Sequence, residues 1–275
     1  MNTIDTDLNN SVAIAIPIYE PHFHFGKQLL LSRRDTHNEH IALHFGCSTK
    51  DEADKLQSFC KDKSCNNVHT CVIECEHIGN KALYKKHTLL QMLVHSFSYI
   101  ACFDCEVVFV KHIPAIVLID RAVNPIMLGN SISSLINERC LSAFGDKALC
   151  AGSWKDVYFW FSDVPVYCSL SLTKFYAHFS NTSKLCECYE HFEHILYIYF
   201  LKLCTDVDVS IVDIGEVYGI HNGWSLEGCS SQILEALVTQ GAPMPLWCSS
   251  EAYLGTSHRV RSSMYLLCHV DRSQP

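Results

Sequence analysis

Two carboxylates interrupt an otherwise apolar run in the first half of the chain. The run YIACFDCEVVFV covers residues 99–110, and its acids are Asp104 and Glu106. Residues two apart on a β-strand point to the same side, so a strand through this run would present both acids together. Two like charges on an apolar strand are costly unless a cation neutralises them. A hard divalent ion with a diphosphate as its other partner fits such oxygen ligands. The alternative is that the strand ends at Phe103 and the acids are solvated in the following loop.

The composition indicates a folded protein that does not hold nucleic acid by charge. The 275 residues are 48% apolar and 18% charged, and the net charge is −8. This balance supports a core and leaves no basic field for phosphate backbones. No apolar run reaches the roughly 18 residues that a membrane helix needs, and residues 1–10 do not resemble a secretory signal. We therefore expect a cytoplasmic protein without a transmembrane segment.

Sixteen cysteines could indicate either disulfides or reduced thiols. Without a signal peptide, reduced thiols are the expected state. Cys102 and Cys105 have CxxC spacing, but on a strand they would face opposite sides, which argues against a shared zinc ion. A structural zinc site at the irregularly spaced cysteines stays open as a minor alternative, and these are Cys60, Cys65, Cys71 and Cys75.

Strand and helix patterns alternate over the first 110 residues or so. Strands are predicted at residues 11–18, 40–45, 68–75 and 99–110, with helices at 27–34, 52–60 and 80–96. This alternation predicts a parallel, doubly wound sheet. Ligands of such sheets bind beyond the carboxyl ends of the strands. The loop after Ile18 and the acidic pair should therefore share one rim.

The second half of the chain is less regular. Helices are predicted at residues 130–144, 170–180 and 189–204, and strands at 156–161 and 207–214. Asp163 follows the aromatic strand 156–161, where a carboxylate could act as a general base on a substrate hydroxyl; Asp156 is a weaker candidate. Trp160 could face a sugar ring, although the aromatic residues of this strand could equally form core.

The order of these features resembles the GT-A-fold glycosyltransferases, particularly compact bacterial sugar transferases of the surface-polysaccharide type. The features are IPIYEPHF at the first strand, Tyr84-Lys85-Lys86 on a helix, and the acidic motif after them. The resemblance covers residues 11–112. It implies an α/β fold with a Rossmann-like, mostly parallel sheet flanked by helices and a less regular C-terminal acceptor region. Within one compact domain, residues 1–112 would bind the nucleotide-sugar and residues 113–275 the acceptor.

Roles carried over from the family fall on matching positions. Asp104 and Glu106 would hold Mn²⁺ or Mg²⁺, and His221 in the C-terminal region would complete the metal shell. The chain departs from the family here, because it has an Asp-Cys-Glu motif in place of two aspartates. The candidates for the donor nucleotide and its diphosphate are Pro17, Tyr19, Glu20, Tyr84, Lys85 and Lys86.

Several of these residues also have a purely structural interpretation. Tyr19 could be a core aromatic at the sheet edge, and at least one of Lys85 and Lys86 could lie on a solvated helix face. His22 and His24 share a side if their loop is extended and could bind a metal, but the sequence supplies no third ligand.

The resemblance implies a metal-dependent, hexosyltransferase-like glycosyltransferase of polysaccharide biosynthesis. It would move a sugar from a nucleotide diphosphate-sugar to a hydroxyl of a glycan or lipid-linked acceptor, in the cytoplasm or peripheral to the inner face of a membrane. Asp163 would be its catalytic base. Three alternatives stay open: a non-catalytic binding module of the same fold, a metal-dependent phosphate-processing hydrolase or transferase, and a thiol enzyme. The sequence has neither a P-loop nor a GxSxG motif.

Overall fold

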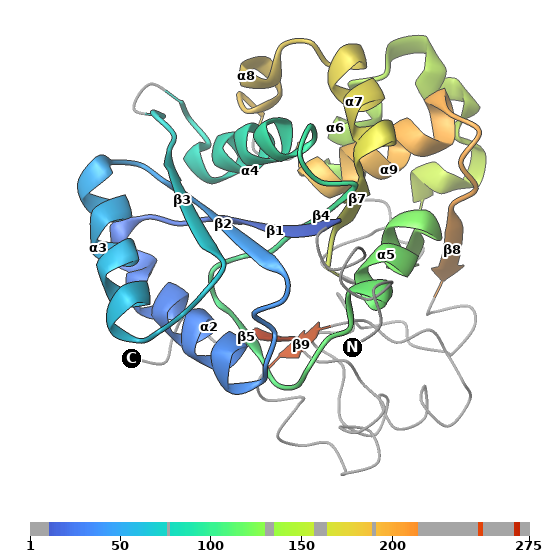
Figure 1. The fold of residues 1–275 in the computed structure, drawn as a ribbon. Helices are drawn as coiled ribbons and strands as arrows, with labels where there is room; N and C mark the ends of the chain where they lie inside the picture. Colours follow the sequence, from blue (N-terminus) through green and yellow to red (C-terminus); the bar gives the residue numbers. More distant parts are fainter. Residues whose placement is uncertain are drawn as a thin grey trace.

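The computed structural model describes residues 11–75, 78–129, 135–156, 164–188, 191–213, 247–249 and 267–269. Its main feature is a five-stranded sheet of order β3-β2-β1-β4-β7 (Figure 1). The strands are β1 (Val12–Pro17), β2 (Ala42–Cys47), β3 (Val68–Val72), β4 (Tyr99–Cys102) and β7 (Val166–Cys168). The first four are parallel and β7 is antiparallel to β4. The predicted α/β class and mostly parallel sheet are confirmed.

The central strand β1 is buried along its whole length because helices cover both faces of the sheet. Its larger side chains, at Val12, Ile14 and Ile16, enter one hydrophobic cluster. Its smaller ones, at Ala13 and Ala15, enter the other. The period of two along a strand thus divides one short apolar run between two cores.

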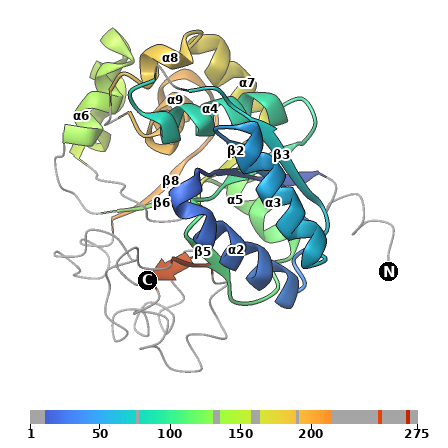
Figure 2. The same ribbon diagram turned by 90° about the vertical axis from the view of Figure 1, so that its left-hand side faces the viewer.

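Different helices form the two faces (Figures 1 and 2). The helices α2 (Phe23–Asp35), α3 (Lys50–Asp62) and α5 (Ala115–Val123) supply side chains to the first cluster. The second cluster takes its side chains from α4 (Lys81–Leu93), α6 (Leu135–Ser142), α7 (Ser169–His178) and α9 (Glu193–Cys204). The remaining helical segments are η1 (Glu20–His22), η2 (Gly145–Asp156) and α8 (Thr182–Leu185).

Two small sheets lie outside the main one. The strand β5 (Val107–Phe109) pairs antiparallel with β10 (Leu267–His269), which pairs in parallel with β9 (Trp247–Ser249). The strands β6 (Ile126–Gly129) and β8 (Ser210–Asp213) pair in parallel. The described part of the C-terminal region therefore returns to the first half of the chain at β5.

The prediction of one strand through residues 99–110 is wrong. The strand β4 ends at Cys102, the chain turns with Val107 N–H donating to Asp104 C=O at 3.3 Å, and β5 joins another sheet. Asp104 and Glu106 are therefore turn residues, and the period of two does not govern their side chains. The predicted strand at 156–161 lies almost wholly outside the described residues, since Asp156 ends η2 and residues 157–163 are not described.

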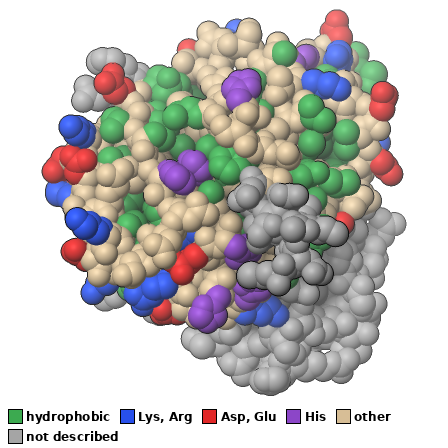
Figure 3. Space-filling model, in the orientation of Figure 1, with side chains coloured by type: hydrophobic (Ala, Val, Ile, Leu, Met, Phe, Trp, Pro, Cys, Tyr) green, Lys and Arg blue, Asp and Glu red, His purple; other side chains and the backbone are tan. Residues whose placement is uncertain are grey.

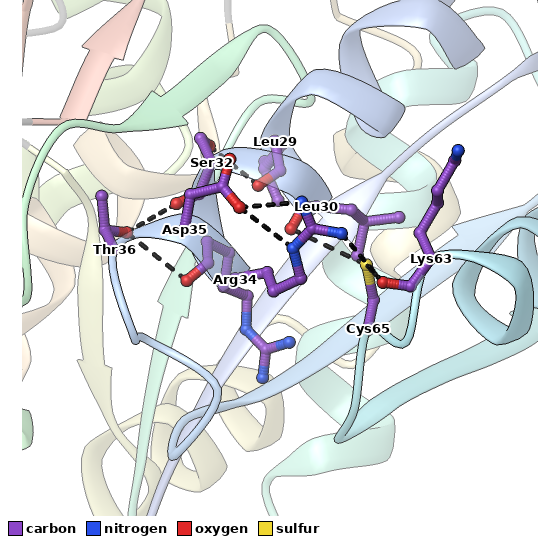
Figure 4. A network of polar contacts seen from close by, with 9 residues as sticks. Leu29, Leu30, Ser32, Arg34, Asp35, Thr36, Lys63 and Cys65 are labelled. Atoms are coloured by element: carbon purple, nitrogen blue, oxygen red, sulfur yellow. Dashed lines mark hydrogen bonds and ion pairs between the residues drawn. The ribbon is translucent and has the colours of Figure 1, made fainter.

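Local signals position the first two helices. Thr49 caps α3 and forms a capping box with Glu52. Two hydrogen bonds join α2 to the segment that ends α3 (Figure 4). Arg34 Nη1 donates to Lys63 C=O at 3.0 Å, and the Cys65 thiol donates to Leu30 C=O at 3.9 Å. These contacts hold α2 and α3 together on the same face of the sheet.

The surface has no field of a single charge in the view of Figure 3. Lysine, arginine, aspartate and glutamate side chains are interspersed toward the side where α2 and α3 lie. Among the described residues, no helix combines the length and apolar character needed to cross a membrane.

Candidate functional site

The main sheet has a topological switch point between β1 and β4. From β1 the chain adds β2 and β3 on one side, and then returns to place β4 on the other side of β1. The acidic loop, which we define as residues 103–106, leaves β4 here, and Phe103 N–H donates to Ala15 C=O of β1 at 2.9 Å. In open α/β sheets, ligands bind in the crevice beyond the carboxyl ends of strands at such a point.

Glu106 faces the loop after β1. Its Oε1 lies 2.9 Å from His22 Nδ1, and its Oε2 accepts from the Cys105 thiol at 3.2 Å. The Glu106 side chain is only 2% exposed, whereas that of His22 is 18% exposed. The expectation that the acids are solvated in a loop is wrong for Glu106. This residue lies in a loop, but its side chain is buried.

Asp104 faces the opposite way, toward α4. Its Oδ1 lies 3.1 Å from Lys86 Nζ, which also lies 3.2 Å from Oε1 of Glu193 at the start of α9. Glu193 is buried, while the Asp104 side chain is 26% exposed. We call these three residues the ion triad. It joins the acidic loop to helices from both halves of the chain.

Charge within the ion triad shifts the pKa values of Lys86 and Glu193. Burial alone would lower the pKa of Lys86, but Asp104 and Glu193 outweigh it and raise that pKa well above its usual range. Burial alone would raise the pKa of Glu193, but Lys86 and His194 hold it well below its usual range. The three members by themselves sum to a charge of −1, His194 lies beside Glu193, and Asp104 is the more exposed of the two acids. This excess favours a cation at the rim beside Asp104.

Lys85 is a structural link between two strand ends. Its Nζ donates to Ile18 C=O at 2.5 Å and to Ser48 Oγ at 2.7 Å, so it joins the loops that follow β1 and β2. Its burial lowers its pKa, an effect that Cys75 and Glu52 partly offset. The interpretation of the Lys85-Lys86 pair as a solvated helix face is wrong for both residues, because Lys85 is buried and Lys86 is only 13% exposed.

The loop after β1 presents Tyr19 at the surface. Tyr19 is 41% exposed, so it is not a core aromatic, and its hydroxyl lies 2.8 Å from His22 Nε2. Glu20 is also exposed, and its carboxylate pairs with Lys55 at 2.9 Å. Pro17 is buried at the end of β1, and Tyr84 is half-buried on α4. Tyr19 and Glu20 are therefore the donor-binding candidates most accessible to a ligand.

Two predicted residues, Asp163 and His221, lie outside the described residues. A different late histidine is placed by pairing: His269 of β10 is the register partner of Val107, the residue after Glu106. The sequence does not predict the place of Glu193 in the ion triad. Its signal in the sequence is a lone acid at the start of the apolar segment 193–201.

The expected pairing of His22 with His24 as metal ligands is replaced in the structure by a group of His22, Cys105 and Glu106. Cys105 Sγ lies 3.8 Å from His22 Nδ1, and candidate ligand atoms of His22, Cys105 and Glu106 lie within 4.8 Å of one another. His22 and His24 do not share an extended loop, because η1 and α2 make this segment helical.

The sequence matches no protein-family model and none of the curated proteins. The fold is similar to that of solved glycosyltransferases, the class that the sequence resembles. One is the bifunctional glycosyltransferase WbbM in its apo structure, with 10% identity, a TM-score of 0.46, and coverage of 85% of this chain and 45% of that chain. Another is residues 1–349 of TarS from S. aureus in complex with UDP, with 12% identity, a TM-score of 0.45, and coverage of 74% and 58%.

A third similar structure is that of core-mannan synthase A (CmsA/Ktr4) from Aspergillus fumigatus in a Mn/GDP form. It has 11% identity, a TM-score of 0.43, and coverage of 73% of this chain and 72% of that chain. The chain thus spans about half the length of the WbbM and TarS chains that it matches. Likeness at this level assigns no chemistry to this chain.

Proposed function

We propose that this chain is a glycosyltransferase that uses a nucleotide diphosphate-sugar. The observation that carries the proposal concerns the loop after β1 with Tyr19 and Glu20, which we call the Tyr19 loop. It meets the acidic loop at the switch point between β1 and β4. A nucleotide needs an exposed aromatic or polar rim for its base and ribose, and a cationic centre for its diphosphate. This edge of the sheet has the exposed Tyr19 for the first and the Asp104 carboxylate, which would hold a cation, for the second, and it is the side where α/β sheets bind ligands.

The Tyr19 loop would bind the nucleoside. The exposed ring of Tyr19 offers a stacking surface for a base, and Glu20 offers carboxylate oxygens to ribose hydroxyls. Lys85 would act indirectly, since its two hydrogen bonds fix the positions of Ile18 and Ser48 at the base of this loop.

Asp104 is the candidate ligand for Mn²⁺ or Mg²⁺ on the donor diphosphate. Its carboxylate lies at the rim of a triad with a net charge of −1, which fits a hard cation. Glu106 fits such a shared site less well, because it is buried against His22. When bound, such an ion supplies positive charge against the leaving diphosphate.

The reaction would be a displacement at the anomeric carbon. The acceptor oxygen forms the new C–O bond, the bond to the diphosphate breaks, and its electron pair leaves with the diphosphate. Asp163 would take the hydroxyl proton, and residues 113–275 would bind the acceptor, a glycan or a lipid-linked glycan. His221 remains a proposed metal ligand, and a place in polysaccharide biosynthesis is likewise part of the proposal.

Thermal unfolding with UDP, GDP, CMP and their sugars tests the proposal, each with Mn²⁺ and with EDTA. We expect one nucleotide class to raise the melting temperature in Mn²⁺, and Asp104→Asn to lose that rise. Asp120→Asn is the matched control, because Asp120 is an exposed acid on α5, outside the acidic loop. No rise with any nucleotide would favour the non-catalytic module, in which Lys86 has taken the place of the cation at Asp104.

A further inference from the structure

Three donor atoms of different chemistry converge beside the acidic loop. His22 supplies an imidazole nitrogen from η1, and Cys105 and Glu106 supply a sulfur and a carboxylate from the turn after β4. Cys105 and Glu106 are buried, and His22 is the partly exposed member. The convergence depends on the fold, because the first of these residues is more than 80 positions from the other two.

The spacing of these atoms is that of one coordination shell. With bonds of about 2.0 to 2.3 Å, neighbouring ligands of a tetrahedral ion lie about 3.3 to 3.8 Å apart. Here Cys105 Sγ lies 3.8 Å from His22 Nδ1 and 3.2 Å from Glu106 Oε2, while Nδ1 and Glu106 Oε1 are 2.9 Å apart. The carboxylate contacts Nδ1 through Oε1 and Sγ through Oε2, so a rotation of the carboxylate, or binding through both of its oxygens, would place all three groups around one ion.

A thiol-enzyme triad does not explain the same contacts. A catalytic histidine holds its nucleophile at one ring nitrogen and its orienting carboxylate at the other. Here the thiol and the carboxylate both lie at Nδ1, and Nε2 faces the Tyr19 hydroxyl at 2.8 Å. The contacts fit a metal ligand, in which one nitrogen coordinates and the other donates to an outer partner.

The donor set selects the kind of ion. Sulfur and imidazole ligands favour zinc and similar transition ions, whereas Mg²⁺ and Mn²⁺ favour oxygen. We propose that His22 Nδ1, Cys105 Sγ and a Glu106 carboxylate oxygen bind one zinc-class divalent ion, with a fourth position left for water or a substrate oxygen. The Cys105 thiol loses its proton to solvent when the ion binds.

This site is separate from the ion proposed at Asp104. It assigns Glu106 to the histidine side of the acidic loop and leaves Asp104 with Lys86 and the donor diphosphate. It therefore does not depend on the proposed glycosyltransferase activity.

Cobalt(II) titration of the chelator-treated, dialysed protein tests the site, in a buffer with a phosphine reductant and no added thiol. Only a cysteine ligand produces a thiolate-to-cobalt charge-transfer band in the near ultraviolet. We expect this band to saturate at one cobalt per chain and to disappear when one equivalent of zinc is added. Cys105→Ser should abolish the band, and His22→Gln should weaken cobalt binding at least tenfold.

Two variants serve as controls. Cys65→Ser makes the same change at another buried cysteine, and Asp104→Asn removes the neighbouring acid; both should keep the band. Absence of the band from the unaltered protein, or its persistence in Cys105→Ser, would overturn the proposal. A Cys105→Ser protein that fails to fold is replaced by His22→Gln and Glu106→Gln, and an unchanged cobalt affinity in both would also overturn it. Nucleotide stabilisation measured on the same samples reports separately on the glycosyltransferase.

Discussion

Replacing Lys86 by methionine should strongly destabilise the fold. Methionine keeps the apolar stem but removes the ammonium that lies 3.1 Å from Asp104 and 3.2 Å from Glu193. Removing one partner of a buried ion pair leaves an uncompensated charge and costs about 3 to 5 kcal/mol. Asp104 is partly exposed and can turn to water, so Glu193 bears most of the cost, and we expect a loss of about 3 kcal/mol.

Lys55 supplies the matched control. It also contacts two carboxylates, Asp51 at 2.8 Å and Glu20 at 2.9 Å, but its side chain is 50% exposed. Exposed ion pairs contribute little to stability because water screens them, so Lys55→Met should lower the free energy of unfolding far less than Lys86→Met. The two variants differ mainly in the burial of the charges involved.

Urea unfolding followed by circular dichroism at pH 8 and at pH 5 measures both effects. In the unaltered protein Lys86 helps to hold the pKa of Glu193 low. Without Lys86, burial raises that pKa, so the folded variant takes up a proton as the pH falls. The destabilisation by Lys86→Met should therefore be smaller at pH 5 than at pH 8. A cost no larger than that of Lys55→Met, or a cost independent of pH, would refute the role of the ion triad.

Three further predictions concern single side chains. Tyr19→Ala should weaken nucleotide binding by about 1 to 3 kcal/mol through lost stacking, with little change in the free energy of unfolding. Isothermal titration measures the affinity and urea unfolding the stability, and an unchanged affinity would contradict the prediction. Lys85→Met should cost about 2 kcal/mol of stability, because Ile18 C=O and Ser48 Oγ lose a charged donor; an unchanged urea midpoint contradicts it. Burial lowers the pKa of His87 from 6.5 to about 4. The unfolded chain therefore binds the extra proton between these values, and stability should fall by up to about 3 kcal/mol as pH drops through this window; urea unfolding across it should show that slope reduced in His87→Gln.

The alternating half of the fold could be predicted because its signals are local. The run 11–18 is apolar and β-branched, Thr49 and Glu52 form a capping box, and the structure has β1 and α3 at these places. The parallel order of the first four strands follows from their separation by helices. The rim shared by the first loop and the acids also follows from this topology.

The directions of the acidic side chains could not be predicted, because they depend on a distant partner. Val107 leaves the line of β4 to pair with His269, and the preceding Glu106 contacts His22 while Asp104 contacts Lys86. No pattern within residues 99–110 encodes that pairing. The sequence therefore identifies the two acidic residues but predicts that they share a single metal site.

The burial of Lys85 and Lys86 was hidden for a similar reason. Two adjacent lysines on a helix ordinarily indicate a solvated face. Here the partners come from four other segments: Ile18 and Ser48 for Lys85, and the acidic loop and Glu193 for Lys86. The cost of burying each ammonium is offset only after those segments assemble.

The central claim is that the switch point between β1 and β4 binds a nucleotide-sugar and activates it for transfer. Release of nucleoside diphosphate from a panel of nucleotide-sugars in Mn²⁺ tests it most directly, since water can replace an unidentified acceptor hydroxyl. We predict release from one nucleotide-sugar class, reduced at least tenfold in Asp104→Asn and unchanged in Asp120→Asn. Equal release by Asp104→Asn, or no release from any donor by a protein that binds none of the nucleotides, would contradict the claim.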